Sequence, residues 1–186
     1  MQVIKPLNFV YMLGSLRKGS LNAIVGRELN GLAPDGVEVT ALESVANVPH
    51  YNADLQAEGF PLPVLKMGEQ IKNSDALIIV TPEYNYSIPG ALKNALDWIS
   101  RLPDAPLAGK PIAIQTASPG AIGGARAQYH LRQTMVFMEG QVLNKPEVII
   151  GLAAQKIDSG SGVIKDQETR DIIARQLQAL AQMATF

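Results

Sequence analysis

The segment Thr81-Pro82-Glu83-Tyr84-Asn85-Tyr86-Ser87-Ile88-Pro89-Gly90 connects two stretches whose patterns indicate an α/β fold. The unbroken apolar run from Ala76 to Val80 before it is typical of a strand buried on both faces. After it, apolar residues recur with helical spacing at Ala91, Leu92, Ala95, Leu96 and Ile99. Open α/β sheets bind their ligands in loops at the carboxyl ends of central strands. The segment is therefore a candidate ligand-binding loop, or else an ordinary turn whose tyrosines pack as core or interface aromatics.

The composition excludes several classes of protein. The chain has 186 residues, 47% of them hydrophobic, which suits a single domain spanning residues 1–186. A net charge of -1 provides no basic field for nucleic acid or an anionic membrane. No apolar run is long enough to span a membrane, and residues 1–8 lack a signal-peptide cleavage site, so we expect a cytoplasmic protein. Without cysteine, any redox function requires a bound cofactor.

A second candidate loop joins an apolar strand at residues 7–13 to a helix for which Ser20 is the predicted N-cap. Helix N-termini carry partial positive charge and free N–H donors, which makes them anion sites. The loop contains no acidic residue and adds the donors Ser15, Arg17, Lys18, Ser20 and Asn22. These donors predict a phosphate site, and the alternative is a capped helix with two solvated basic residues. Neither a P-loop nor a dinucleotide fingerprint is present.

The remaining patterns continue the alternation of strands and helices. In the first half of the chain we expect a short strand at 37–41, a long loop at 47–63 and a helix at 64–73. In the second half we expect a strand at 112–117, a helix ending near 138 and a fifth strand at 142–150 that is interrupted at 144–146. A Gly/Ser-rich loop at 159–162 then precedes a closing helix. Five strands alternating with five helices predict a flavodoxin-like, doubly wound parallel sheet of order 2-1-3-4-5 with helices on both faces. That order brings three loops together where flavodoxin-like folds bind flavin mononucleotide (FMN).

The third of these loops, residues 118–126, has three glycines in five residues, at Gly120, Gly123 and Gly124. They permit close approach of a ligand to the backbone, or they merely punctuate the loop. Neither His50 nor His130 has partners at the spacing of a metal site or a catalytic triad, so no metal is expected.

Three motifs carry a family resemblance: Gly14-Ser15-Leu16-Arg17-Lys18-Gly19-Ser20-Leu21-Asn22, Pro82-Glu83-Tyr84-Asn85, and the run from Ser87 to Trp98. They resemble the NADPH-dependent FMN reductase family, and within it the bacterial chromate and quinone reductases. The resemblance implies bound FMN, with NADPH or NADH as co-substrate. It implies that the FMN phosphate is bound by Ser15, Arg17, Ser20 and Asn22. It also implies that one side of the flavin ring contacts Pro82, Glu83, Tyr84 and Asn85, and that the other side faces Ser118 and Gly120. Leu21 and Tyr86 complete the predicted cofactor-binding residues.

The function implied by the resemblance is an FMN-dependent NAD(P)H oxidoreductase for quinones, with chromate or azo compounds reduced incidentally. NAD(P)H would deliver hydride to the flavin and leave, and the acceptor would then take its place in a ping-pong exchange without a catalytic side chain. The resemblance also implies dimers that pair into tetramers, with Arg126, Tyr129 and Glu147 joining subunits. Arg101 is expected near the mouth of the site, facing anionic substrates.

Two other functions remain open at this point. A flavodoxin-like electron carrier would have the same fold and cofactor without its own NAD(P)H oxidation. Such carriers are usually strongly acidic, whereas this chain has a net charge of only -1. A flavin-free interaction protein would keep only the fold, and the presence of Arg17 and of the 83–85 motif argues against it. The sequence leaves the physiological acceptor, the preference between NADPH and NADH, and the role of the 47–63 loop undetermined.

Overall fold

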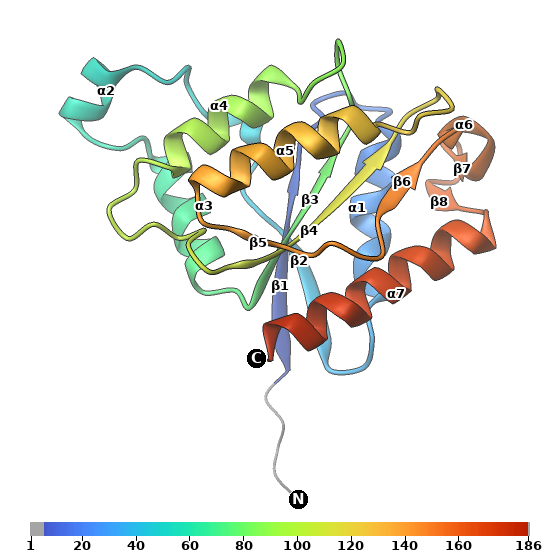
Figure 1. Cartoon of the computed structure of the whole chain (residues 1–186). Coiled ribbons are helices and arrows are strands. Elements are labelled where there is room, and N and C mark those ends of the chain that lie inside the picture. The colour runs from blue at the N-terminus through green and yellow to red at the C-terminus, as the bar shows by residue number, and fades with distance from the viewer. Residues whose placement is uncertain (1–5, 186) are drawn as a thin grey trace, which may run out of the picture.

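The computed structural model describes residues 6–185 and is built around a parallel β-sheet (Figure 1). The strand order is β2-β1-β3-β4-β5, with β6 also paired to β4. The strands are β1 (Leu7–Leu13), β2 (Val37–Ala41), β3 (Ala76–Thr81), β4 (Pro111–Ala117), β5 (Gln141–Val142) and β6 (Val148–Ile150). The predicted flavodoxin-like fold, its order 2-1-3-4-5 and the interruption of the fifth strand are confirmed. Because all these strands are parallel, their carboxyl ends lie at one edge of the sheet.

Helices cover both faces of the sheet (Figure 1). One face packs against α1 (Leu21–Leu32) and α7 (Gln167–Ala184), and the other against α3 (Leu62–Lys72), α4 (Gly90–Ile99) and α5 (Ala125–Phe137). Side chains of a strand point alternately to its two faces, so β3 contributes Leu77 and Ile79 to one cluster and Ile78 and Val80 to the other. No helix within residues 6–185 has both the length and the apolar character needed to cross a membrane.

Two regions are more structured than we expected. The 47–63 loop contains α2 (Ala53–Glu58), preceded by a 3₁₀ turn at Val45–Asn47, and α3 begins at Leu62. The Gly/Ser-rich loop is the turn of a hairpin between β7 (Ile157–Asp158) and β8 (Val163–Ile164), which follows the short α6 (Ala153–Lys156). The expectation of five helices was therefore too low. The expectation for residues 1–8 concerns mainly residues 1–5, which lie outside the described range.

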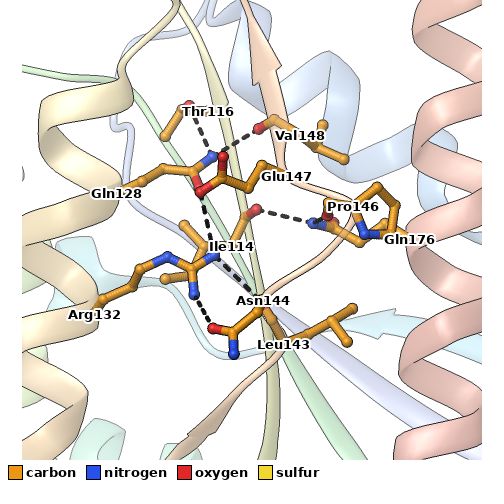
Figure 2. A network of polar contacts seen from close by, with 10 residues as sticks. All are labelled: Ile114, Thr116, Gln128, Arg132, Leu143, Asn144, Pro146, Glu147, Val148 and Gln176. Atoms are coloured by element: carbon orange, nitrogen blue, oxygen red, sulfur yellow. Dashed lines mark hydrogen bonds and ion pairs between the residues drawn. The ribbon is translucent and has the colours of Figure 1, made fainter.

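The chain between β5 and β6 is held by side chains from two helices (Figure 2). Gln128 and Arg132 come from α5, Gln176 comes from α7, and all three donate hydrogen bonds to backbone carbonyls. Because α5 and α7 lie on opposite faces of the sheet, the segment is fastened from both sides. The donor–acceptor distances are 2.9 Å for Gln176 Nε2 to Pro146 O, 2.7 Å for Gln128 Nε2 to Val148 O and 3.1 Å for Arg132 Nη2 to Leu143 O.

Candidate functional site

Three loops meet at the carboxyl edge of the sheet and enclose a cavity of about 240 Å³. They follow β1, β3 and β4. The residues lining the cavity are Ser15, Arg17, Ser20, Leu21, Asn22, Pro82, Glu83, Tyr84, Ala117, Ser118 and Pro119. A hollow of about 610 Å³ beside α7 is larger, but charged side chains of both signs line it and none of the three loops reaches it.

Nine of the twelve predicted cofactor-binding residues line this cavity. Asn85, Tyr86 and Gly120 lie on the same loops but outside its lining. Ala117 and Pro119 also line the cavity and were not predicted, although both adjoin the predicted Ser118 at the end of a strand and could have been inferred from that position.

The loop after β1 approaches the end of β3 closely. A Cβ atom at Gly14 would lie 2.3 Å from Thr81 Oγ1, so only glycine fits there without displacing the threonine. Ser20 caps α1 as predicted, because its hydroxyl accepts a hydrogen bond from the N–H of Ala23 at 3.3 Å. Ser15 and Ser20 are buried, whereas Arg17 is exposed and donates to the carbonyl of Gly19 at 2.6 Å. The loop therefore gathers hydroxyl and guanidinium donors at a helix N-terminus, where an anion is stabilised.

Asn22, predicted as a phosphate donor, also has a structural role. Its side chain is buried and forms two hydrogen bonds with the backbone of Ala117, at the end of β4. Nδ2 donates to the carbonyl at 2.9 Å, and Oδ1 accepts from the N–H at 3.0 Å. The side chain thus joins the start of α1 to the loop after β4. The second hydrogen of Nδ2 and the Asn22 backbone N–H are the donors that remain for a ligand at the helix end.

The loop after β3 folds into a tight turn. Tyr84 and Ser87 exchange two backbone hydrogen bonds of 2.9 Å each, and the residues between them, Asn85 and Tyr86, have φ angles of 49° and 66°. This left-handed conformation is uncommon for residues other than glycine and costs about 1–2 kcal/mol per residue. Both tyrosine side chains are exposed, so they are not core aromatics. Tyr84 lines the cavity, whereas the Tyr86 ring lies against Arg126.

Glu83 points its carboxylate at the start of α5. The side chain is 11% exposed; Oε2 accepts from the N–H of Ala127 at 3.1 Å, and Oε1 lies 3.3 Å from Nη1 of Arg126. The Arg126 guanidinium also lies 4.0 Å from the centroid of the Tyr86 ring. Arg126, which we expected at a subunit interface, therefore binds two residues of the β3–α4 loop within its own chain.

The loop after β4 packs against the turn that follows β6. Ser118 donates its N–H to the carbonyl of Ile150 at 3.0 Å. A Cβ atom at Gly123 would lie 2.7 Å from the nitrogen of Gly151, so the crowding there comes from the protein's own backbone. Gly123 and Gly124 also have φ angles of 67° and 93°. Of the three glycines, only Gly120 has room for a Cβ atom, whose nearest neighbour would be Ser118 Oγ at 3.7 Å.

The residues expected outside the cofactor set are more dispersed. Arg101 follows α4, a ten-residue helix about 15 Å long whose other end adjoins the cavity, and its guanidinium lies 5.6 Å from the Tyr51 ring centroid. The structure of one chain does not bring Arg101 to the cavity. Tyr129 is exposed on α5, and Glu147 lies 3.8 Å from Nη2 of Arg132.

The comparison with known proteins identifies the family. Residues 7–155 match the family model described as NADPH-dependent FMN reductase. The chain belongs to this family. The predicted family is thus confirmed, and FMN and NAD(P)H are the cofactor and co-substrate that define it.

Relatives agree with this assignment along almost the whole chain. A quinone reductase of Escherichia coli K12 is 55% identical over 179 residues, which cover 96% of this chain and 95% of the relative. An NAD(P)H-dependent FMN reductase of Pseudomonas aeruginosa is 51% identical over 167 residues, covering 90% and 89%. The solved structure of the flavoenzyme FerB, an NAD(P)H:(acceptor) oxidoreductase of Paracoccus denitrificans, has a TM-score of 0.86 and 35% identity, covering 96% and 97%.

The paired hydrogen bonds of Asn22 predict a stability effect. We expect Asn22→Ala to lower the free energy of unfolding by about 1–3 kcal/mol for each Ala117 group left buried and unpaired. Urea denaturation of the flavin-free protein measures this effect. Asn73→Ala is the matched control, since Asn73 is exposed and has no side-chain hydrogen bond within the described residues. Equal stability of the two variants would contradict the structural role of Asn22.

Proposed function

We propose that this protein is an FMN-dependent NAD(P)H oxidoreductase that reduces quinones. The observation that carries the proposal is the pairing, in one cavity, of a helix N-terminus rich in anion donors with a rigid loop of flat side chains. These features match the two ends of FMN, whose phosphate is a dianion and whose ring system is planar. Bound FMN would supply the acceptor and donor of the hydride, and the protein would supply binding, orientation and access.

The phosphate end of FMN would bind at the start of α1. The hydroxyls of Ser15 and Ser20, the guanidinium of Arg17 and the backbone N–H groups of Leu21 and Asn22 are the proposed donors. For Arg17, this requires its guanidinium to leave the carbonyl of Gly19 and turn toward the phosphate. A bond between guanidinium and phosphate, in which both partners are charged, is stronger than the bond to a neutral carbonyl that it would replace.

The ring would lie between the loops after β3 and β4. Pro82, Glu83, Tyr84, Asn85 and Tyr86 are proposed on one side, and Ser118 and Gly120 on the other. Among the described residues, the N–H groups of Glu83, Asn85 and Tyr86 have no protein acceptor, so they are free to donate to the polar edge of a ring. Backbone donors held in place in this way would stabilise negative charge that develops on the ring.

Quinones are the proposed acceptors for two reasons. The E. coli relative named quinone reductase is 55% identical to this chain over nearly its full length. The cavity lining also includes the exposed ring of Tyr84, and the exposed Leu16 belongs to one of its loops; both suit a flat apolar molecule. Chromate is proposed as an incidental acceptor, because a cavity open to solvent admits small oxidants as well. A pure electron carrier is disfavoured, since a net charge of -1 offers little attraction to basic redox partners.

The function is tested by recording the absorbance spectrum of the purified protein under anaerobic conditions. We expect flavin bands that bleach on addition of NADPH or NADH and return when benzoquinone is added, and return more slowly with chromate. Flavin that neither nucleotide bleaches would favour the electron carrier instead. A protein that is colourless and takes up no added FMN would contradict both functions.

The phosphate site makes a separate prediction. We expect Arg17→Ala to weaken FMN binding by about 10- to 100-fold, because hydrogen bonds to charged groups contribute about 1.5–3 kcal/mol. Riboflavin, which lacks the phosphate, should bind both proteins alike. Quenching of flavin fluorescence measures both affinities, and Arg27→Ala, which removes an exposed arginine further along α1, is the control. An equal loss of riboflavin and FMN binding would show that Arg17 does not contact the phosphate.

We also propose that two copies of the chain associate through the outer face of α5, and that such dimers pair into tetramers. Val136 and Phe137 are 78% and 74% exposed, and Tyr129 lies on the same side of the helix, two turns earlier. Apolar side chains this exposed are rarely left in water when they adjoin one another. Arg126 and Glu147 would add polar contacts between subunits, besides their contacts with Glu83 and Arg132 in their own chain.

Breaking this face should change the assembly. We expect Phe137→Glu to reduce the mass measured by light scattering toward that of one chain, because a carboxylate would be buried against apolar residues of a second copy. Leu65→Glu on α3 is the control, since Leu65 is an exposed apolar residue on a different surface. An unchanged mass for Phe137→Glu would place any interface elsewhere.

A further inference from the structure

We propose that Glu83 is a positioning residue whose carboxylate couples the two loops that flank the flavin ring. Its side chain belongs to the loop after β3, yet it binds the first turn of α5, the helix into which the loop after β4 leads. This inference rests on the proposed FMN site and adds to it a role that the motif alone does not indicate. It assigns the Glu83 side chain to the protein framework and leaves only the backbone of this residue to the ligand.

Helix α5 depends on this contact because it lacks a cap of its own. Its N-cap residue is Gly124, no side chain of the N-cap position accepts a hydrogen bond, and the first turn contains no acidic residue. Helices α1, α2 and α7, by contrast, each have an N-cap residue whose side chain accepts a hydrogen bond from the first turn, namely Ser20, Asn52 and Asp166. Glu83 thus supplies α5 with both a hydrogen-bond acceptor and a negative charge, which the positive end of a helix favours.

Arg126 strengthens the contact by binding the loop at a second point. Its guanidinium pairs with the Glu83 carboxylate and also lies over the ring of Tyr86, three residues further along the loop. The Glu83 side chain is only 11% exposed, so solvent screens this ion pair less than it would a pair on the open surface. His130, one turn along α5, adds a third contact through Nδ1, 2.8 Å from Ser87 Oγ.

These contacts explain how the strained turn persists. The left-handed residues Asn85 and Tyr86 are held between Glu83 and Ser87, and both of these bind α5. Unusual backbone conformations are kept only where the surroundings determine them. When the Glu83 carboxylate is removed, the turn is free to relax and the start of α5 loses its cap, so both flanks of the ring loosen together. The donors at the start of α1 take no part in these contacts.

The experiment compares Glu83→Ala and Glu83→Gln with the wild-type protein, using FMN and riboflavin as separate probes of the flavin-free protein. We expect Glu83→Ala to weaken both flavins by the same factor, about tenfold, because it acts on the ring and not on the phosphate. Glu83→Gln should have a smaller effect, since its amide oxygen still accepts the Ala127 N–H. Glu28→Gln is the matched control: it removes the negative charge from the 2.6 Å Glu28–Arg170 pair, which lies away from the cavity.

Hydrogen exchange of the flavin-free protein provides the second readout. We expect Glu83→Ala to raise exchange in residues 83–87, where the Tyr84 and Ser87 N–H groups are hydrogen-bonded, and in residues 118–127 together, and Glu28→Gln to leave both segments unchanged. Flavin affinities of Glu83→Ala equal to those of wild type would overturn the inference, as would raised exchange in only one of the two segments. If wild type bound no flavin, the proposed function would fail, and the exchange measurement alone would decide whether Glu83 couples the loops.

Discussion

Strand β3 has a parallel strand on each edge and helices over each face, so all six of its residues are buried. This double pairing sets the geometry of the site. Leu13 of β1 is aligned with Val80 of β3, which is in turn aligned with Gln115 of β4, so the three strands end at nearly the same level. Their loops must then leave the sheet side by side, although they are separated by about 70 and about 35 residues in the sequence. A binding cavity follows from the strand pairing before any ligand is present.

Each of the three loops around the cavity is bound to a helix or strand elsewhere in the chain. Asn22 joins the first loop to the end of β4, Glu83 joins the second loop to α5, and Ser118 joins the third to the end of β6. In each of these hydrogen bonds, the donor, the acceptor or both are backbone groups. Such ties restrict the loops before binding, and less conformational entropy is then lost when a flat ligand enters.

The elements and the location of the site could be predicted because they depend on local patterns. The apolar run of β3, the helical spacing after Gly90 and the donors around Ser20 are each legible within about a dozen residues. The roles of Asn22 and Glu83 could not be predicted, because their partners lie 95 and 44 residues away in the sequence. Helix α2 escaped detection because it buries no residue and so leaves no apolar period. The position of Arg101 depends on the length and direction of α4, which the sequence pattern does not convey.

The segment between β5 and β6 shows how such a fold can diverge during evolution. Gln128, Arg132 and Gln176 bind the carbonyl groups of Val148, Leu143 and Pro146, and every amino acid has a carbonyl group (Figure 2). These bonds therefore constrain the three side chains that donate them and not the identity of the residues that accept them. Within β6, Val148 and Ile150 are constrained instead by their burial in the core. At this edge of the sheet, selection should act through hydrogen bonding on α5 and α7 and through packing on the strand.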